Sequence, residues 1–116
     1  MHDAQRFLPL SPHQFHILLT LAGGERHGYA LIQEIGRRTD GAMRLGTGTL
    51  FTAIARLAEL GLIGETGRAD ERRRFYRLLP LGREVLQAET ARLEALVRYA
   101  HASGIRPPAP AASRRS

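Results

Sequence analysis

The sequence predicts a mainly α-helical chain with one small β-hairpin. Three short segments with apolar residues at helical spacing come first, and two strand-like runs joined by a polar stretch follow them. A long segment with a wide apolar stripe then begins at Pro80. The 116 residues are one domain's worth, enough to bury about two thirds of the unfolded surface.

The first predicted helix begins at Ser11. Ser11 and Gln14 match the capping-box pattern, and Pro12 occupies the first helical position, where its missing N–H costs nothing. Gly23-Gly24 ends the helix. Its apolar face consists of Phe15, Leu18, Leu19 and Ala22.

Two further helices are predicted over residues 28–38 and 47–60. The apolar stripe of the earlier one is Leu31, Ile32 and Ile35. The core face of the later one is Leu50, Ile54 and Leu57, and its polar face is Thr49, Thr52, Arg56 and Glu59. Gly61 is placed as the glycine that follows a helix C-terminus, with Leu62 as its apolar contact.

A β-hairpin follows, with strands expected over residues 62–66 and 73–79 and a flexible connection over residues 67–72. Phe75 and Arg77 alternate with Tyr76 and Leu78, which is the period of a strand with two unlike faces. The last helix is expected from Pro80 to about Ala102, and the Pro-, Ala- and Ser-containing tail over residues 103–116 is expected to be disordered.

The net charge of +6 comes from arginine alone, because the chain has no lysine. Residues 68–83 carry six arginines against Asp70 and Glu71, and the tail adds three more, whereas residues 1–67 are balanced. Local arginine clusters are typical of proteins with a polyanionic partner such as nucleic acid. A solvated charged loop is the alternative interpretation, and charge alone favours it.

Several classes of protein have little support. Without cysteine there is no disulfide framework or thiolate metal site, which is compatible with a reducing cytoplasm, where we expect the protein. No apolar run approaches the roughly 20 residues of a membrane span. His13 and His16 have no nearby ligand to complete a metal site. No catalytic motif and no cofactor fingerprint occurs, so we expect a protein that is not an enzyme and has no cofactor.

Three helices followed by a two-stranded wing and a long helix make a winged helix-turn-helix arrangement. Five segments, in the order and spacing expected, resemble the PadR family of bacterial transcriptional regulators. They are His27-Gly28-Tyr29-Ala30-Leu31, Leu45-Gly46-Thr47-Gly48-Thr49-Leu50-Phe51, Leu57-Ala58-Glu59-Leu60-Gly61-Leu62-Ile63, Arg72-Arg73-Arg74-Phe75-Tyr76-Arg77-Leu78 and Leu81-Gly82.

The resemblance implies a homodimeric DNA-binding repressor of the type with a single C-terminal helix. It divides the chain into a winged helix-turn-helix domain (residues 1–79), a dimerisation helix (residues 80–102) and the tail. Two positions depart from the family, which usually has tyrosine at Phe51 and a hydroxylated residue at Leu79. Leu79 has no side-chain oxygen with which to cap the last helix.

Double-stranded DNA is the expected partner, contacted by the polar face of the third helix, the wing and the start of the second helix. The candidate DNA-binding residues are Tyr29, Thr47, Thr49, Thr52, Arg56, Arg72 and Arg74. Solvent exposure without contact remains the alternative for the helix and the wing, and half-buried packing is the alternative for Tyr29. In a strand Arg72 and Arg74 share one face and Arg73 takes the other.

The apolar stripe of the last helix is too wide for an isolated helix in water, so we expect it to form a dimer core. The candidate interface residues are Phe7, Leu10, Leu86, Leu93, Leu96, Val97 and Ala100. A small-molecule effector of unknown identity could act at this interface. The rival hypothesis is a winged-helix module that binds an acidic protein surface and has no specific DNA site.

Overall fold

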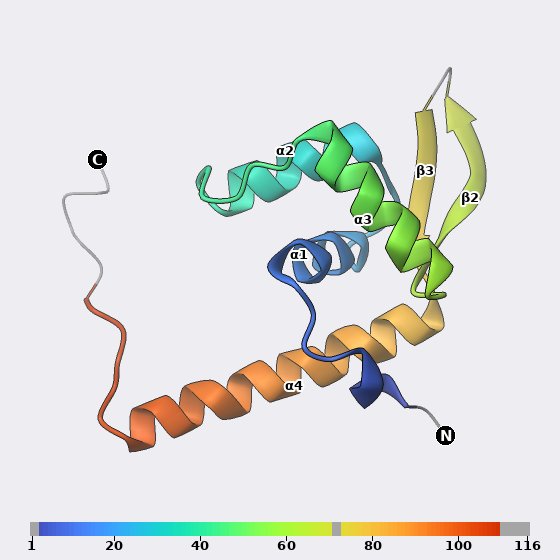
Figure 1. Ribbon diagram of the computed structural model, residues 1–116. Coiled ribbons are helices and arrows are strands. Elements are labelled where there is room, and N and C mark those ends of the chain that lie inside the picture. Colours follow the sequence, from blue (N-terminus) through green and yellow to red (C-terminus); the bar gives the residue numbers. More distant parts are fainter. Residues whose placement is uncertain (1–2, 71–72, 110–116) are drawn as a thin grey trace.

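The computed structural model describes residues 3–70 and 73–109, and in these the fold is mainly helical with one small sheet (Figure 1). The chain begins with a short 3-10 helix, η1 (Ala4–Phe7), and the first two α-helices are α1 (Pro12–Leu21) and α2 (Gly28–Arg38). Helix α3 (Thr47–Glu59) leads into the wing. The strands are β1 (Arg26–His27), β2 (Ile63–Asp70) and β3 (Arg73–Leu78), and α4 (Pro80–Ala102) closes the fold.

The helix ends confirm the signals in the sequence. The Ser11 hydroxyl accepts a hydrogen bond from the Gln14 N–H at 3.1 Å, and the Gln14 side chain accepts one from the Ser11 N–H at 3.1 Å. Gly61 has φ +80°, a conformation that suits glycine, and the Leu62 N–H donates to the Leu57 carbonyl at 3.0 Å. This closure turns the chain directly from α3 into the wing.

The sheet is larger than the predicted hairpin. Its order is β1-β3-β2, with β3 antiparallel to both neighbours, and the short strand β1 was not predicted. Strand β2 continues to Asp70, so the expectation of a connection was wrong for residues 67–70, while residues 71–72 lie outside the described residues. Backbone pairing of Ala69 with Arg74 and of Asp70 with Arg73 extends the ladder after an irregularity that follows Glu65, and such pairing does not require apolar side chains.

The predicted alternation along β3 also fails, because Phe75 and Tyr76 are both buried. The His27 ring of β1 packs edge-on against Phe75 with the ring centroids 5.3 Å apart, while Tyr76 joins the core. Both faces of the strand are therefore covered at this point, which a two-stranded hairpin could not achieve.

All four α-helices contribute to one apolar core. The side chains that are almost completely buried include Ile17, Leu18, Leu31, Ile35, Leu50, Leu57, Leu62 and Val85. Gly82 allows α4 to enter this core closely, since a Cβ atom there would lie 2.1 Å from the Leu62 carbonyl oxygen. The first half of α4 is thus part of the same core as the winged helix.

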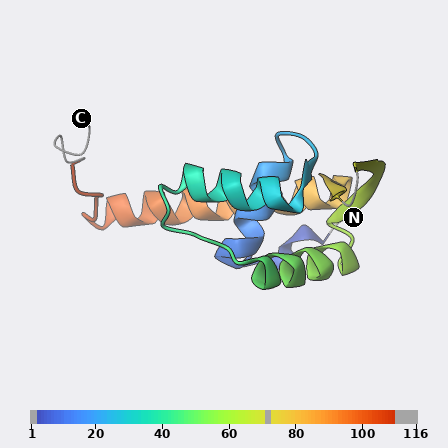
Figure 2. The same ribbon diagram turned by 90° about the horizontal axis from the view of Figure 1, so that it is seen from above.

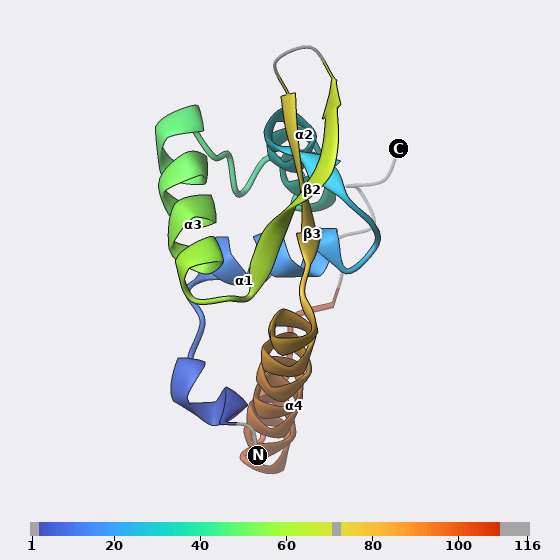
Figure 3. The same cartoon turned by 90° about the vertical axis from the view of Figure 1, so that its right-hand side faces the viewer.

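The chain segment before α1 is fixed to α4 by a buried carboxylate. Glu89 accepts a hydrogen bond from the Leu10 N–H at 3.0 Å and two from the Arg92 guanidinium at 2.6 and 2.9 Å. The hydrogen bonds from Arg92 and Leu10 lower the pKa of Glu89, and burial opposes them less strongly. This contact lays η1 along α4 (Figure 3).

Candidate nucleic-acid interface

Helix α3 presents its polar face to solvent as the sequence predicts. Leu50, Ile54 and Leu57 are buried, while the opposite side forms a continuous exposed surface that we call the α3 face. The α3 face consists of Thr47, Gly48, Thr49, Phe51, Thr52, Ala55, Arg56 and Glu59. The candidate DNA-binding residues of this helix therefore lie on one accessible surface, at the front of the molecule in Figure 1.

Arg56 is exposed but has an acidic partner on its own helix. Its guanidinium lies 3.1 Å from a Glu59 carboxylate oxygen, and both side chains are largely in water. Exposed pairs of this kind contribute about 0–1 kcal/mol, so the pair opens readily when a competing anion or base edge approaches.

The start of α2 lies next to the α3 face. His27 caps this helix, because its Nδ1 accepts a hydrogen bond from the Ala30 N–H at 3.1 Å. Tyr29 follows in the first turn and is 60% exposed, not half-buried as the alternative prediction had it. The phenol is therefore available beside the N-terminal end of a helix, where anions are favoured.

A hollow of about 230 Å³ separates α2, α3 and the wing. Its lining is His27, Gly28, Tyr29, Ile32, Thr47, Phe51, Arg73, Arg74 and Tyr76. The Phe51 ring lies directly over Gly28, where a Cβ atom would be only 2.6 Å from the ring Cζ. Phe51 is nevertheless 46% exposed, so one part of the ring packs against α2 and another faces solvent.

The wing brings two described arginines to this hollow, and both are exposed. Arg74 pairs with Glu65 at 3.3 Å, and Nη1 of Arg73 lies 3.4 Å from Nε2 of His27. These contacts agree with the predicted alternation of the two arginines, because His27 pairs with Phe75 across the sheet and Glu65 pairs with Tyr76. Both side chains still line the hollow, since arginine stems are long enough to reach it from either face of the strand. Arg72 lies outside the described residues.

A second, more open groove runs along the other side of α3, between that helix and the start of α1. Thr49, Thr52 and Arg56 line it from α3, and His13 and Gln14 line it from α1. The sequence analysis did not connect α1 with this surface, because only the packing of α1 against α3 brings the two together.

The predicted interface residues, of which two precede α1 and five lie on α4, divide into three groups by burial. Leu86 is buried within one chain, and so is Leu10, so neither needs a partner to leave water. Phe7 and Leu93 are half-buried, as is Ala100, whereas Leu96 and Val97 are 50% and 53% exposed. The exposed group lies on the part of α4 that extends beyond α1 in Figure 1.

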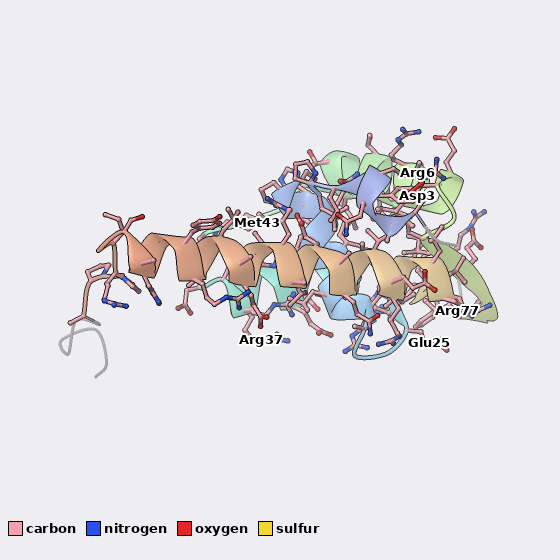
Figure 4. All side chains as sticks on the ribbon, turned by 90° about the horizontal axis from the view of Figure 1, so that it is seen from below. Asp3, Arg6, Glu25, Arg37, Met43 and Arg77 are labelled. Atoms are coloured by element: carbon pink, nitrogen blue, oxygen red, sulfur yellow. The ribbon has the colours of Figure 1, made fainter. Side chains whose placement is uncertain are left out.

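Seen from below, α4 crosses the whole molecule, with Arg37 and Met43 on opposite sides of it (Figure 4). Seen from above, its last turns extend past the end of α2, and no described helix lies over them (Figure 2). Tyr99 is exposed in this stretch, and Ile105 follows the end of the helix, also exposed. The uncovered end of α4 is therefore an apolar surface within the described part of the chain.

No group of three potential ligands among His, Cys, Asp and Glu is close enough to hold a metal ion in residues 3–70 and 73–109. Burial, helped by Arg38 and His13, lowers the pKa of His16, whose Nδ1 is buried without a hydrogen-bond partner. His16 is thus a neutral packing residue of α1. None of the described helices combines the length and the apolar character that crossing a membrane requires.

Comparisons with known proteins agree with this geometry. Residues 17–88 match the transcriptional regulator PadR-like family, while no curated protein matches the sequence. A transcriptional regulator from Clostridium thermocellum has 27% sequence identity and a TM-score of 0.69, over 77% of this chain and 86% of that one.

Two more distant solved structures share the fold. A PadR family transcription regulator from Clostridium difficile has 19% identity and a TM-score of 0.64, over 78% of this chain and 96% of its own. RosR of H. salinarum has 24% identity and a TM-score of 0.62, over 80% and 79%. Because the family match extends from α1 to the buried half of α4, the chain belongs to the PadR-like family of transcriptional regulators.

Proposed function

We propose that this chain is a sequence-specific DNA-binding regulator that works as a homodimeric repressor. The observation that carries the proposal is the exposed α3 face, which lies between the arginine-bearing wing and the start of α1. A helix presented in this way fits the major groove, and the flanking elements are placed to contact phosphates.

The dimer is supported by the uncovered end of α4. Leu96 and Val97 continue the side of the helix that buries Val85 and Leu86 nearer its start, so a second copy would complete a core that one chain leaves open. Two-fold symmetry then requires an inverted-repeat operator with half-sites about 34–36 Å apart.

Repression and effector response rest on membership of the family and not on geometry. An effector at the dimer interface would release DNA by changing the angle between the two α3 helices. It can shift that equilibrium only to the extent that it binds one arrangement more tightly than the other.

The test is selection of binding sites from random duplex DNA, followed by fluorescence anisotropy with the selected site, a scrambled competitor and a salt series. We expect an inverted repeat to be enriched and its binding to resist the competitor. Weak binding to every sequence that disappears near physiological salt would contradict the proposal. That outcome would favour the rival hypothesis, a winged-helix module that binds an acidic protein.

A further inference from the structure

The α3 face carries hydrogen-bonding side chains and one large apolar side chain. The hydrogen-bonding side chains are those of Thr47, Thr49, Thr52, Arg56 and Glu59, and the large apolar one is that of Phe51. Thr49, Thr52 and Arg56 line the groove beside α1, whereas α3 contributes Thr47 and Phe51 to the hollow beside the wing. The large exposed group on the hollow's side of this helix is therefore apolar. Among the groups in the major groove, the apolar one that distinguishes base pairs is the 5-methyl group of thymine.

We propose that Phe51 contacts a thymine methyl group in each operator half-site. This inference rests on the proposed function and goes beyond it, because it names the base and the residue that selects it. The Phe51 ring is held from behind by Gly28 and is still 46% exposed, so its accessible edge has a fixed position. A fixed apolar edge can discriminate a methyl group from a hydrogen atom.

The residues around the Phe51 ring match a DNA strand, with its bases and phosphates, better than they match a base alone. Thr47 and Tyr29 line the hollow beside Phe51, and Arg73 and Arg74 bring positive charge to it. A strand whose thymine methyl meets Phe51 carries phosphates that these arginines can approach. The hollow thus matches the strand both in apolar surface and in charge.

Arg56 provides an internal control because it lines the other side of α3. It contributes to the groove beside α1, whereas Phe51 contributes to the hollow beside the wing. The two residues therefore face different strands or different base pairs. Loss of Arg56 should weaken binding without changing the contribution of the thymine methyl group.

The experiment replaces every thymine of the selected operator, one position at a time, by deoxyuridine, which lacks only the methyl group. At one symmetry-related position we expect an affinity loss of about fourfold, the equivalent of about 0.8 kcal/mol for one buried methyl-sized group. Substitution by 5-bromodeoxyuridine, whose bromine is close to a methyl group in size, should restore the affinity.

The same duplexes are then measured with Phe51→Ala and Arg56→Ala. We expect Phe51→Ala to bind the thymine and deoxyuridine operators equally well, while Arg56→Ala keeps the fourfold difference. A difference that survives in Phe51→Ala would overturn the inference. Circular dichroism checks the fold of both variants.

Photocrosslinking of the wild-type protein to the 5-bromodeoxyuridine operator keeps the test valid even if Phe51→Ala does not fold. We expect the crosslinked peptide to contain Phe51, and a crosslink confined to another element would overturn the inference. If the operator is bound selectively but deoxyuridine has no effect anywhere, the inference fails and the proposed function stands. If no sequence is bound selectively, the proposed function fails first.

Discussion

At the scale of single residues, Arg56 is the proposed base-recognition group, and its pair with Glu59 determines how it could act. Its pair with Glu59 is exposed and weak, so the guanidinium can exchange that carboxylate for a guanine edge with little loss. The Glu59 carboxylate also repels a phosphate group that approaches Arg56. Arg56 therefore leaves Glu59 only where its hydrogen bonds to a base edge stabilise the complex by more than the lost ion pair. Arg56 is therefore suited to base recognition more than to general attraction.

We expect Arg56→Ala to weaken operator binding by about 1–3 kcal/mol and to relax the preference at one base pair of each half-site. Anisotropy titrations against all single-base variants of the operator would measure both effects. Arg98→Ala removes an exposed arginine from α4, outside both grooves, and serves as the matched control. An unchanged base preference in Arg56→Ala would remove Arg56 from the set of base-contacting residues.

The lowered pKa of Glu89 gives a prediction of how the free energy of unfolding depends on pH. The hydrogen bonds from Arg92 and Leu10 lower its pKa in the folded chain below the ordinary value of 4.5. The unfolded chain therefore binds this proton first as the pH falls. The stabilisation is complete above that ordinary value and is lost as the pH falls through the lower folded value.

Urea unfolding between pH 7 and pH 3 would measure this contribution. We expect the wild-type free energy of unfolding to fall below about pH 4.5, and Glu89→Gln to lack that component of the decrease. Glutamine still offers an oxygen to the Leu10 N–H, whereas Glu89→Leu leaves that buried donor without a partner, at a further cost of about 1–3 kcal/mol. Parallel pH curves for the wild type and Glu89→Gln would contradict the assignment.

At the scale of elements, the sequence predicts best those features that depend on residues close together in the chain. The capping box at Ser11 and the glycine at the end of α3 depend on neighbours within a few residues, and both are as expected. Strand β1 has only two residues, too few for any periodicity, and it forms because His27 pairs with Phe75. The register shift between Glu65 and Ala69 in β2 cannot be predicted from the alternation of residues.

The candidate site divides in the same way. Thr49, Thr52 and Arg56 follow from the period of one helix, because the residues opposite a buried stripe must be exposed. The hollow does not follow from any one segment, because its walls come from α2, α3 and β3. The pair of Glu65 with Arg74 likewise depends on the pairing of two strands.

The contact between α4 and the wing gives a prediction for an element. Gly82→Ala would place its Cβ atom 2.1 Å from the Leu62 carbonyl oxygen, which belongs to the backbone and cannot rotate away. We expect a loss of about 1–3 kcal/mol or a failure to fold, measured by urea unfolding or by expression of folded protein.

Gly36→Ala is the matched control, because this glycine lies inside α2 and, apart from its chain neighbours and the backbone of its own helix, no atom comes within 4 Å of the position of a Cβ. Removing the flexibility of glycine there should raise the free energy of unfolding by about 0.5–1 kcal/mol. Equal effects of the two variants would show that helix propensity, and not the close approach of α4, determines the cost at Gly82.

At the scale of the whole molecule, α4 is one helix with two different environments. Its first half belongs to the core that positions α3 and the wing, and its second half leaves the same side uncovered. Because one continuous helix joins the two halves, we propose that a change in how the uncovered half is packed reaches the core beneath α3. Dimerisation and DNA recognition are therefore mechanically connected in the proposed regulator.

This connection is tested by Val97→Glu, which places a charge on the exposed apolar side of α4. Because burying an unpaired carboxylate is costly, we expect sedimentation to show a monomer where the wild type forms a dimer. Ala91→Glu adds the same charge at another exposed position of α4, on the side opposite the apolar surface, and should leave the dimer intact.

The affinity of Val97→Glu for the inverted repeat should fall, while its binding to an isolated half-site is retained, since each α3 face remains folded. A Val97→Glu protein that still sediments as a dimer would place the interface on another surface and would separate α4 from operator recognition.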